Sequence, residues 1–210
     1  MIIGVAGQFR QGKDKASDYL AERLDFSRDA FAYGVKKVFC EYFGVDLDFV
    51  ERWKVMDEPP PGFLMTVRRS LQFIGDGFRS IRDDVWVESL FRRTIDNVVI
   101  SDVRYRNELA AVKAKGGKNL LVYRPGFLND DPNGSEAQIR PFVEYFLSAG
   151  KEGRVESKGD FGLVDFFVVN DGGLDDFYGK LDSLVVPHLV PKGTASFATR
   201  REIRTTPSIP

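Results

Sequence analysis

The sequence predicts an α/β fold in which a parallel sheet is flanked by helices. Short apolar runs alternate with segments of helical period along most of the 210 residues. Several of those runs are apolar throughout, which is typical of parallel strands that are buried on both faces. Hydrophobic residues make up 43% of the chain, enough for one domain with an inserted lid to build its core without disulfides.

The chain opens with two strand–helix pairs. Residues 1–6 are apolar and predict a strand, and after a glycine-bounded turn the period of Lys13–Leu24 predicts a helix. A second strand is expected over residues 26–32, and a second helix over residues 35–43, which Gly44 ends. This order of elements favours a parallel sheet.

The middle of the chain predicts helices around a break. Residues 45–81 contain helical stretches, and the proline loop at residues 59–62 interrupts them. A further helix is expected to begin after Asp83 or Asp84, either of which can cap it, and to extend to Ile95.

Buried strands and a polar insertion follow. Residues 98–102 are apolar and end in a carboxylate, and residues 120–123 are apolar and lead to Arg124. Between them, residues 107–115 predict a helix that two glycines end. Residues 127–162 are polar, rich in glycine and partly helical, so we expect an insertion that covers a site.

A last strand at residues 166–169 and a last helix at residues 174–185 close the predicted core near residue 186. Residues 187–210 carry four basic side chains against one acidic side chain, together with several prolines. We expect them to form a basic, disordered or loosely docked tail. A solvated tail without a partner and a weak contact with nucleic acid or a protein both stay open.

Charge and rare residues exclude several classes of function. The net charge of -1 disfavours a DNA-coating or membrane-binding protein. The single cysteine, Cys40, excludes an intramolecular disulfide and suits a reducing compartment. The single histidine, His188, excludes a histidine triad and a multi-histidine metal site. Because the apolar start is short and lacks a basic flank, we expect no export signal and a soluble, cytoplasmic protein.

The turn between the first strand and the first helix is the strongest functional signal. Residues 7–13 have the spacing G-x-x-x-x-G-K of a phosphate loop. Its glycines let backbone N–H groups point inward, the helix N-terminus adds positive potential, and Lys13 bridges terminal phosphates. A chance glycine-rich turn is the alternative. The expected ATP-binding residues are Gly7, Gln8, Phe9, Arg10, Gln11, Gly12, Lys13, Asp14 and Lys15.

Two carboxylates are expected to order Mg²⁺ near this loop. Asp14 stands where a hydroxyl commonly ligates the ion, and it can bind the ion or one of its waters, or simply favour the first turn of the helix. Asp102 and Arg104 follow a predicted strand, and strand ends of a parallel sheet share one crevice, so both should face Lys13. A pair that only fixes a loop is the alternative.

Arginines gather around apolar and aromatic residues elsewhere in the chain. A guanidinium group offers a planar fork for phosphate and a flat face for a base, and a plain salt bridge is the alternative for each. The group comprises Arg68, Arg69, Arg79 and Arg124, with Trp86 nearby. With the phosphate loop, these features predict a protein that binds a nucleoside triphosphate with Mg²⁺ and transfers or hydrolyses its γ-phosphate. The short chain and the insertion favour a small-molecule acceptor.

The motifs resemble those of the bacteriophage and bacterial deoxynucleoside monophosphate (dNMP) kinases. The matching segments, in order, are GKD at 12–14, FAYGVK at 31–36, RRSLQFIG at 68–75, DVWV at 84–87, ISDVRYRNE at 100–108 and Asn170. The resemblance covers residues 1–186. Tyr33, Gly34, Asp76 and the segment 134–136 depart from the family pattern, which bears on base preference and lid contacts.

The resemblance implies a P-loop kinase fold with a helical dNMP-binding region at about 45–95 and a lid at about 127–162. It implies ATP as phosphate donor, Mg²⁺ as cofactor and a dNMP as acceptor, with no membrane or specific nucleic acid partner and with a homodimer left open. If the protein is phage-encoded, it would work in the host cytoplasm. The implied catalytic residues are Lys13, Asp14, Asp102, Arg104 and Arg124, with Mg²⁺ on Asp14 and Asp102. The implied dNMP contacts are Lys36, Arg69, Gln72, Arg79, Trp86 and Arg104, and the implied lid arginines are Arg124 with Arg140 or Arg154.

Two other functions stay open. A related kinase with another small-molecule acceptor, such as dephospho-coenzyme A, would share the architecture. A non-catalytic nucleotide-binding or assembly protein would use the phosphate loop as a switch and the basic tail as a handle.

Overall fold

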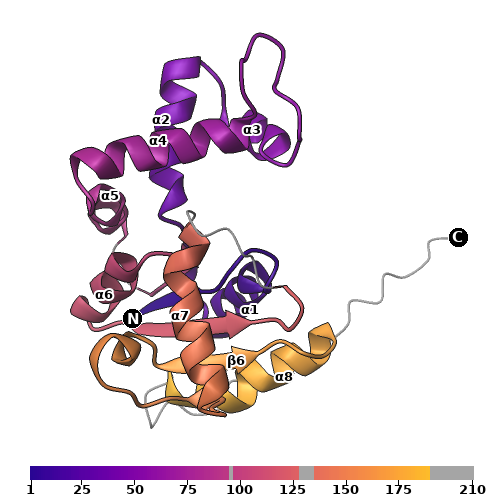
Figure 1. The fold of residues 1–210 in the computed structure, drawn as a ribbon, viewed down its shortest axis with the longest axis vertical. Coiled ribbons are helices and arrows are strands. Elements are labelled where there is room, and N and C mark those ends of the chain that lie inside the picture. Colours follow the sequence, from indigo (N-terminus) through magenta and orange to yellow (C-terminus); the bar gives the residue numbers. More distant parts are fainter. Residues whose placement is uncertain (95–96, 128–134, 190–210) are drawn as a thin grey trace, which may run out of the picture.

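A computed structural model describes residues 1–94, 97–127 and 135–189 (Figure 1). It confirms the predicted α/β fold. Within the described residues, a six-stranded sheet has the order β2-β3-β1-β4-β6-β5. Neighbouring strands are parallel except for β5, which pairs antiparallel with β6. The strands are β1 (Ile2–Ala6), β2 (Ser27–Asp29), β3 (Val98–Val103), β4 (Lys118–Tyr123), β5 (Gly153–Arg154) and β6 (Phe166–Val169).

The helices lie close to their predicted positions. They are α1 (Lys13–Leu24), α2 (Ala32–Phe43), α3 (Leu47–Trp53), α4 (Val67–Ile81), α5 (Val85–Arg93), α6 (Arg106–Ala114), α7 (Ser135–Ser148) and α8 (Leu174–Leu184), with 3-10 turns η1 (Gly159–Leu163) and η2 (Val186–His188). The first helix has the predicted bounds. The second begins three residues earlier than predicted, and β2 is correspondingly short.

Helices cover both faces of the sheet. Successive residues of a strand point to opposite faces, so Ile3 and Val5 of β1 pack in the core formed with α1 and α8. Ile2 and Ala6 pack in the core on the other face, where α6 and α7 lie. Figure 1 shows α7 crossing in front of the sheet. Burying each large apolar side chain contributes about 1.5–3 kcal/mol, so these layers hold the strand ends in place.

Part of the predicted lid at residues 127–162 belongs to the core, because α7 packs against the sheet. Ile139, Phe142, Val143 and Phe146 are all buried in the core against the sheet. One face of this helix is therefore a layer of the fold. Residues 128–134, the rest of the predicted cover before α7, lie outside the described residues.

The helices α2, α3 and α4 form a helical body at the top of Figure 1, and Val35 of α2 with Trp86 and Leu90 of α5 joins it to the core against β3. A small core of Phe39, Val50 and Val67 holds α2, α3 and α4 together. The predicted proline loop returns the chain so that Phe63 stacks on Phe39, with ring centres 5.8 Å apart. Asp84 begins α5, but its carboxylate pairs with Arg82 at 2.6 Å and caps no helix N–H group, contrary to the prediction.

The fold continues beyond the predicted core boundary at residue 186. Val186 and Leu189 are both buried against the sheet, because η2 turns the chain back onto β6. Residues 190–210, most of the predicted tail, lie outside the described residues. In the described ranges, no helix combines the length and the apolar character that crossing a membrane requires.

Candidate active site

The parallel strands deliver the predicted functional residues to one edge of the sheet. β1 lies between β3 and β4, and the chain first adds β2 and β3 on one side of β1 and then β4 and β6 on the other. The loop at residues 7–12 follows β1, Arg104 follows β3, Arg124 follows β4 and Asn170 follows β6. Ligands of open α/β sheets bind outside the carboxyl ends of the strands at such a switch point.

Two buried glutamines brace the loop after β1 from inside. The backbone N–H of Gln8 donates to Gln11 Oε1 at 2.8 Å, and Gln11 Nε2 donates to Gln8 Oε1 at 3.3 Å. Asn170, from the end of β6, donates to the Gln11 carbonyl at 3.1 Å. Sequence reasoning treated these glutamines as backbone donors only. Their side chains hold the loop in shape before a ligand binds, which lowers the cost of binding.

Both ends of the loop require glycine. Gly7 has φ 152° and Gly12 has φ 103°, a region that side chains strain. A Cβ on Gly7 would lie 2.6 Å from the Val122 carbonyl oxygen, and one on Gly12 would lie 2.6 Å from Asn170 Nδ2. Close approach of the Val122 carbonyl at Gly7 and of the Asn170 side chain at Gly12 therefore requires glycine at both positions.

Lys13 is the first residue of α1 and is 6% exposed. Its ammonium group donates to the Gln8 carbonyl at 2.7 Å, so the side chain folds back over the phosphate loop. A phosphate oxygen can take the place of that carbonyl. The helix N-terminus and the ammonium together give this end of the loop the positive potential that binds anions.

Asp14 lies on the surface of α1, with 79% of its side chain exposed. The guanidinium group of Arg28, in β2, binds it at 2.5 Å and also pairs with Asp18. A metal ion at Asp14 would therefore share the carboxylate with Arg28.

Asp102 has a structural role that the sequence analysis did not foresee. Its two oxygens accept the backbone N–H groups of Phe31 at 2.7 Å and Ala32 at 2.8 Å, so it caps the start of α2. This cap explains why α2 begins early. Each carboxylate oxygen keeps a lone pair, which leaves room for a water of a hydrated cation. Among the described residues, no group of three or more His, Cys, Asp or Glu side chains could hold a metal by itself.

Glu108 joins α4 to the end of β3 from a buried position. It is 2% exposed, and its Oε2 accepts the backbone N–H groups of Arg104 at 2.8 Å and Tyr105 at 3.1 Å. Its Oε1 accepts from Arg79 at 3.3 Å, while the Arg79 guanidinium lies 4.0 Å from the centre of the Tyr105 ring. Burial, followed by the nearby charge of Asp102, raises the pKa of Glu108 to about 7. The motif contained this residue, but no role had been predicted for it.

We expect Glu108 to make the protein less stable as the pH rises from about 4.5 to 7. The pKa of its carboxyl is about 7 in the folded chain and 4.5 in the unfolded chain, so the folded state holds the proton more tightly. The resulting stabilisation is complete below pH 4.5 and is lost as the pH rises through 7. It amounts to on the order of 3 kcal/mol. Urea unfolding from pH 4 to 8 should show a flatter profile for Glu108→Gln, and equal slopes in both proteins would contradict the assignment.

One face of α4 is directed towards the phosphate loop and the residues after β3. Helical geometry puts Arg68, Gln72, Gly75 and Arg79 on the same side. Arg79 contacts Glu108, and the Arg68 guanidinium lies 4.9 Å from the centre of the Phe9 ring in the phosphate loop. The resemblance implies the neighbouring Arg69 as a dNMP contact, one position further along the helix.

Arg68, Arg69 and Gln72 are all exposed on α4. Arg69 lies about 100° around the helix from Arg68. Arg68 contacts the phosphate loop, and Arg79 contacts the residues after β3.

Two other predicted dNMP contacts are engaged elsewhere. Lys36 of α2 pairs with Glu51 of α3 at 2.6 Å. Trp86 is 4% exposed, and its indole N–H donates to the Gly75 carbonyl at 3.0 Å, so the ring packs between helices. A Cβ at Gly34 would lie 3.0 Å from that ring, which explains the glycine that departs from the family pattern.

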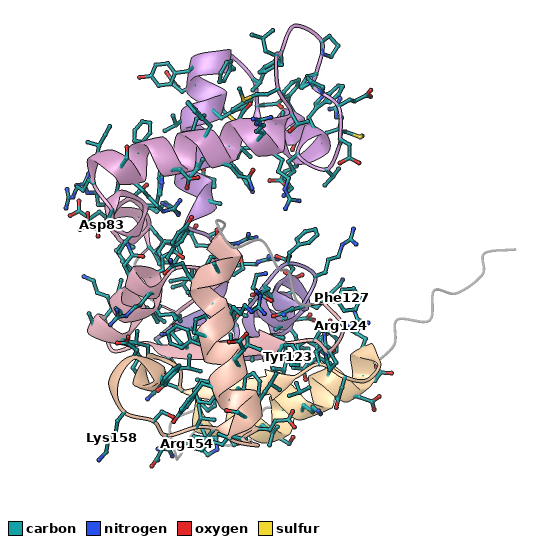
Figure 2. The ribbon with its side chains drawn as sticks, viewed as in Figure 1. Asp83, Tyr123, Arg124, Phe127, Arg154 and Lys158 are labelled. Carbon is teal, nitrogen blue, oxygen red and sulfur yellow. The ribbon has the colours of Figure 1, made fainter. Side chains whose placement is uncertain are left out.

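The predicted lid arginines lie in different places. Arg124 is exposed after β4, 4.8 Å from the centre of the Phe127 ring, and Figure 2 shows both near the phosphate-loop side of the sheet. Arg140 pairs with Glu144 within α7 at 2.7 Å. Arg154 of β5 lies opposite Phe166 in the strand register, and Phe166 is the first residue of β6. Arg154 therefore lies at the end of the sheet opposite the phosphate loop. The prediction that Arg154 closes over the phosphoryl group is wrong, because β5 runs antiparallel.

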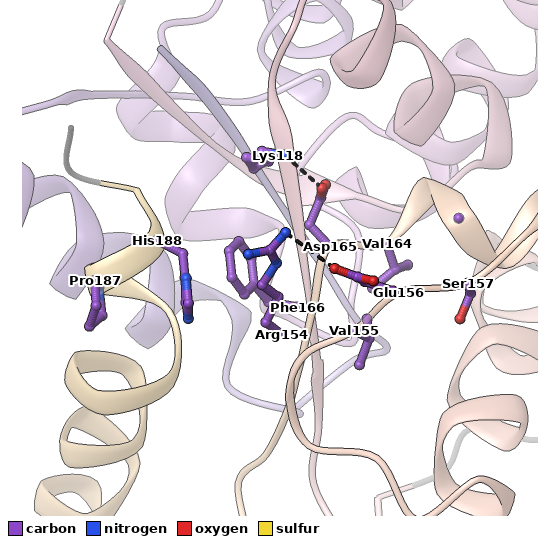
Figure 3. A pocket seen from close by; sticks show the side chains of 11 residues that line it. Lys118, Arg154, Val155, Glu156, Ser157, Val164, Asp165, Phe166, Pro187 and His188 are labelled. Atoms are coloured by element: carbon purple, nitrogen blue, oxygen red, sulfur yellow. Dashed lines mark hydrogen bonds and ion pairs between the residues drawn. The ribbon is translucent and has the colours of Figure 1, made fainter. Parts of the chain in front are cut away.

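A cavity of about 450 Å³ lies at that opposite end (Figure 3). Its charged lining includes Lys118, which pairs with Asp165 at 3.1 Å, and Arg154, which pairs with Glu156 at 3.3 Å. The cavity is lined by the beginnings of β4 and β6, away from the phosphate loop. It is therefore separate from the candidate active site.

Two viral proteins are similar to this chain over most of its length. A protein of Acanthamoeba polyphaga mimivirus described as "Putative deoxynucleotide monophosphate kinase" is 28% identical over 204 residues, which covers 88% of this chain and 96% of that protein. "Uncharacterized protein ORF76" of Ictalurid herpesvirus 1 (strain Auburn) is 27% identical over 191 residues, covering 82% and 73%. No protein-family model matches the chain. The first relative confirms the resemblance to dNMP kinases that the motifs indicate.

Solved structures with some likeness to this chain include two small-molecule kinases. A shikimate kinase from Acinetobacter baumannii, in complex with shikimate, has a TM-score of 0.48 at 14% identity, covering 89% of this chain and 93% of that one. A dephospho-CoA kinase from Campylobacter jejuni has a TM-score of 0.37 at 14% identity, covering 85% and 92%.

Proposed function

We propose that this protein is an ATP- and Mg²⁺-dependent kinase that phosphorylates deoxynucleoside monophosphates to diphosphates. The observation that carries the proposal is that cationic side chains come to the phosphate-loop edge of the sheet from two sides. Lys13 lies over the loop itself. From α4, Arg68 lies 4.9 Å from the centre of the Phe9 ring in that loop, and Arg79 reaches the residues after β3. A kinase with a phosphorylated acceptor needs two phosphate sites, whereas a nucleotide hydrolase needs only one.

In this proposal the backbone of residues 7–12 cradles the ATP phosphates and Lys13 neutralises charge on the transferred group. Arg68, Arg79 and Arg104 bind the phosphate of the acceptor, and the exposed Gln72 remains a candidate for its sugar or base. Arg124 stays a candidate for the transferring phosphoryl group. The acceptor oxygen is already ionised on a phosphate, so no general base is required. Positioning and electrostatic stabilisation supply the catalysis.

Asp14 and Asp102 fit a Mg²⁺ ion that keeps several waters and binds mainly to phosphates. Asp14 is exposed beside the loop, and both Asp102 oxygens have spare lone pairs after capping α2. When bound, the ion supplies neutralisation of phosphate charge. ATP and a dNMP remain the proposed partners. A cytoplasmic location and a homodimer stay predictions.

The proposal is tested by ADP release from ATP and Mg²⁺ with dAMP, dCMP, dGMP or dTMP as acceptor. Dephospho-coenzyme A, a sample without acceptor and a sample with a chelator serve as controls. Release that needs both a dNMP and the metal supports the proposal. Release with dephospho-coenzyme A alone favours that kinase class, and ATP binding without acceptor-dependent release favours a switch or assembly protein. A chain ending at Leu189, which keeps the buried end of the fold, should stay active as a kinase but not as a tether.

We expect Arg68→Ala to raise the KM for the dNMP by about tenfold, while the neighbouring Arg69→Ala changes it by less than threefold. Losing a charge-assisted contact to phosphate costs about one factor of ten in binding. Arg69 is the matched control, since it removes the same charge from the adjacent position on α4. Steady-state kinetics with varied dNMP at saturating ATP measure both. A larger effect at Arg69 would mean that the other face of α4 binds the acceptor.

A further inference from the structure

Glu108 ties two chain segments that come from different parts of the fold. It lies in the first turn of α6, and one of its oxygens holds the backbone of Arg104 and Tyr105 after β3. The other oxygen receives Arg79 from α4, which belongs to the helical body on the far side of the crevice. At 2% exposure the carboxylate itself is out of reach of a substrate.

The contacts of Arg79 fix the plane of its guanidinium group as well as its position. The group lies 4.0 Å from the centre of the Tyr105 ring, which supports one face. Glu108 binds one nitrogen at 3.3 Å and Asp76 binds another at 3.6 Å. A guanidinium group recognises phosphate through a planar fork, so its orientation decides how well it binds.

We propose that Glu108 is a positioning residue of the acceptor site, which sets Arg79 and the Arg104 backbone in one fixed arrangement so that both arginines meet the acceptor phosphate. This inference rests on the proposed function, because it assigns the acceptor phosphate to these arginines. Glu108 acts through them and has no contact with the reacting atoms. A general base is not needed there, since a phosphate oxygen attacks in its ionised form.

Replacing Glu108 by glutamine separates positioning from simple support of the fold. The amide oxygen can still accept the backbone N–H groups of Arg104 and Tyr105, so the end of β3 keeps its cap. The amide nitrogen then faces Arg79, donor against donor, and the guanidinium group is released. Arg79→Lys removes the same contact from the other side, because an ammonium group lacks the planar fork.

The experiment is a double-mutant cycle on dNMP binding. Calorimetry at pH 8, where Glu108 with its pKa of about 7 is mostly ionised, gives the dissociation constant of the best dNMP without ATP for the full-length wild type, Glu108→Gln, Arg79→Lys and the double variant, and ATP binding is measured in parallel. We expect each single change to weaken dNMP binding by about tenfold and ATP binding by less than twofold. Because Glu108 acts through Arg79, the double variant should bind about as well as either single variant, and not a hundredfold more weakly.

Asp165→Asn is the matched control, because it removes another largely buried carboxylate that accepts a backbone N–H group. Asp165 pairs with Lys113 and Lys118 and accepts from the Asn119 N–H near the other end of the sheet. It should leave dNMP binding within twofold of wild type. If Glu108→Gln does not fold, Glu108→Asp and Arg79→Lys carry the same cycle.

Three results would overturn the proposal: unchanged dNMP binding in a folded Glu108 variant, additive losses in the double variant, or equal losses for ATP and dNMP. The proposed function fails separately. If the wild type binds a dNMP but releases no ADP, the kinase activity is contradicted while the cycle still decides the role of Glu108. A wild type that binds no dNMP overturns both.

Discussion

Replacing Lys13 by alanine should lower turnover by about 10²–10³-fold, which is the cost of removing one preorganised group that stabilises charge in a transition state. The ammonium lies at the start of α1 and folds over the phosphate loop, where the terminal phosphates of ATP are expected. Rates of ADP release at saturating ATP and dNMP measure the loss.

The control for Lys13→Ala must separate chemistry from folding. The variant removes the donor to the Gln8 carbonyl, so its melting temperature should be measured together with its rate of ADP release. Lys158→Ala removes an exposed lysine that lies far from the loop, at the lower end of Figure 2, and should leave turnover unchanged. A folded Lys13→Ala protein with turnover within tenfold of wild type would contradict the role of the phosphate loop.

Asp102→Ala should have the second largest effect, because it acts on stability and on turnover together. Two backbone N–H groups at the start of α2 lose their acceptor, which should lower the free energy of unfolding by about 2 kcal/mol. If the carboxylate also orders a water of Mg²⁺, turnover should fall at least tenfold and half-maximal activity should need more Mg²⁺. Urea unfolding and a Mg²⁺ titration of activity measure the two effects.

Asp46→Ala separates a lost cap from a lost metal contact. Asp46 caps α3 by accepting the Phe49 N–H at 2.7 Å, in the helical body away from the strand ends. It should cost about 1 kcal/mol and leave the Mg²⁺ dependence unchanged. Asp102→Ala with an unchanged Mg²⁺ dependence would restrict Asp102 to capping α2.

The local parts of this structure follow from local sequence. The strand at residues 1–6, the glycine-bounded loop and the helix Lys13–Leu24 were predicted nearly to the residue, because hydrophobic period and glycine position decide them within a few residues. The same holds for β3 and β4, whose continuous apolar runs identify buried parallel strands.

Contacts between distant parts of the chain could not be predicted in this way. Asp102 caps a helix 70 residues earlier, and Glu108 meets an arginine 29 residues earlier on α4. The sequence around Asp102 or Glu108 does not predict which distant residue its carboxylate will contact. Arg154 was misplaced for a similar reason, since only the pairing of β5 with β6 decides which end of the sheet it occupies. Sequence therefore located the strand ends, whereas tertiary packing chose which side chains meet there.

Direct detection of the product tests the central claim most sharply. The protein is incubated with ATP, Mg²⁺ and each dNMP in turn, and chromatography with mass detection quantifies the matching dNDP beside an equal sample of Lys13→Ala. The account predicts one dNDP for every ADP formed with at least one dNMP, and almost none from the variant. ADP without dNDP, or equal dNDP from both proteins, would contradict it.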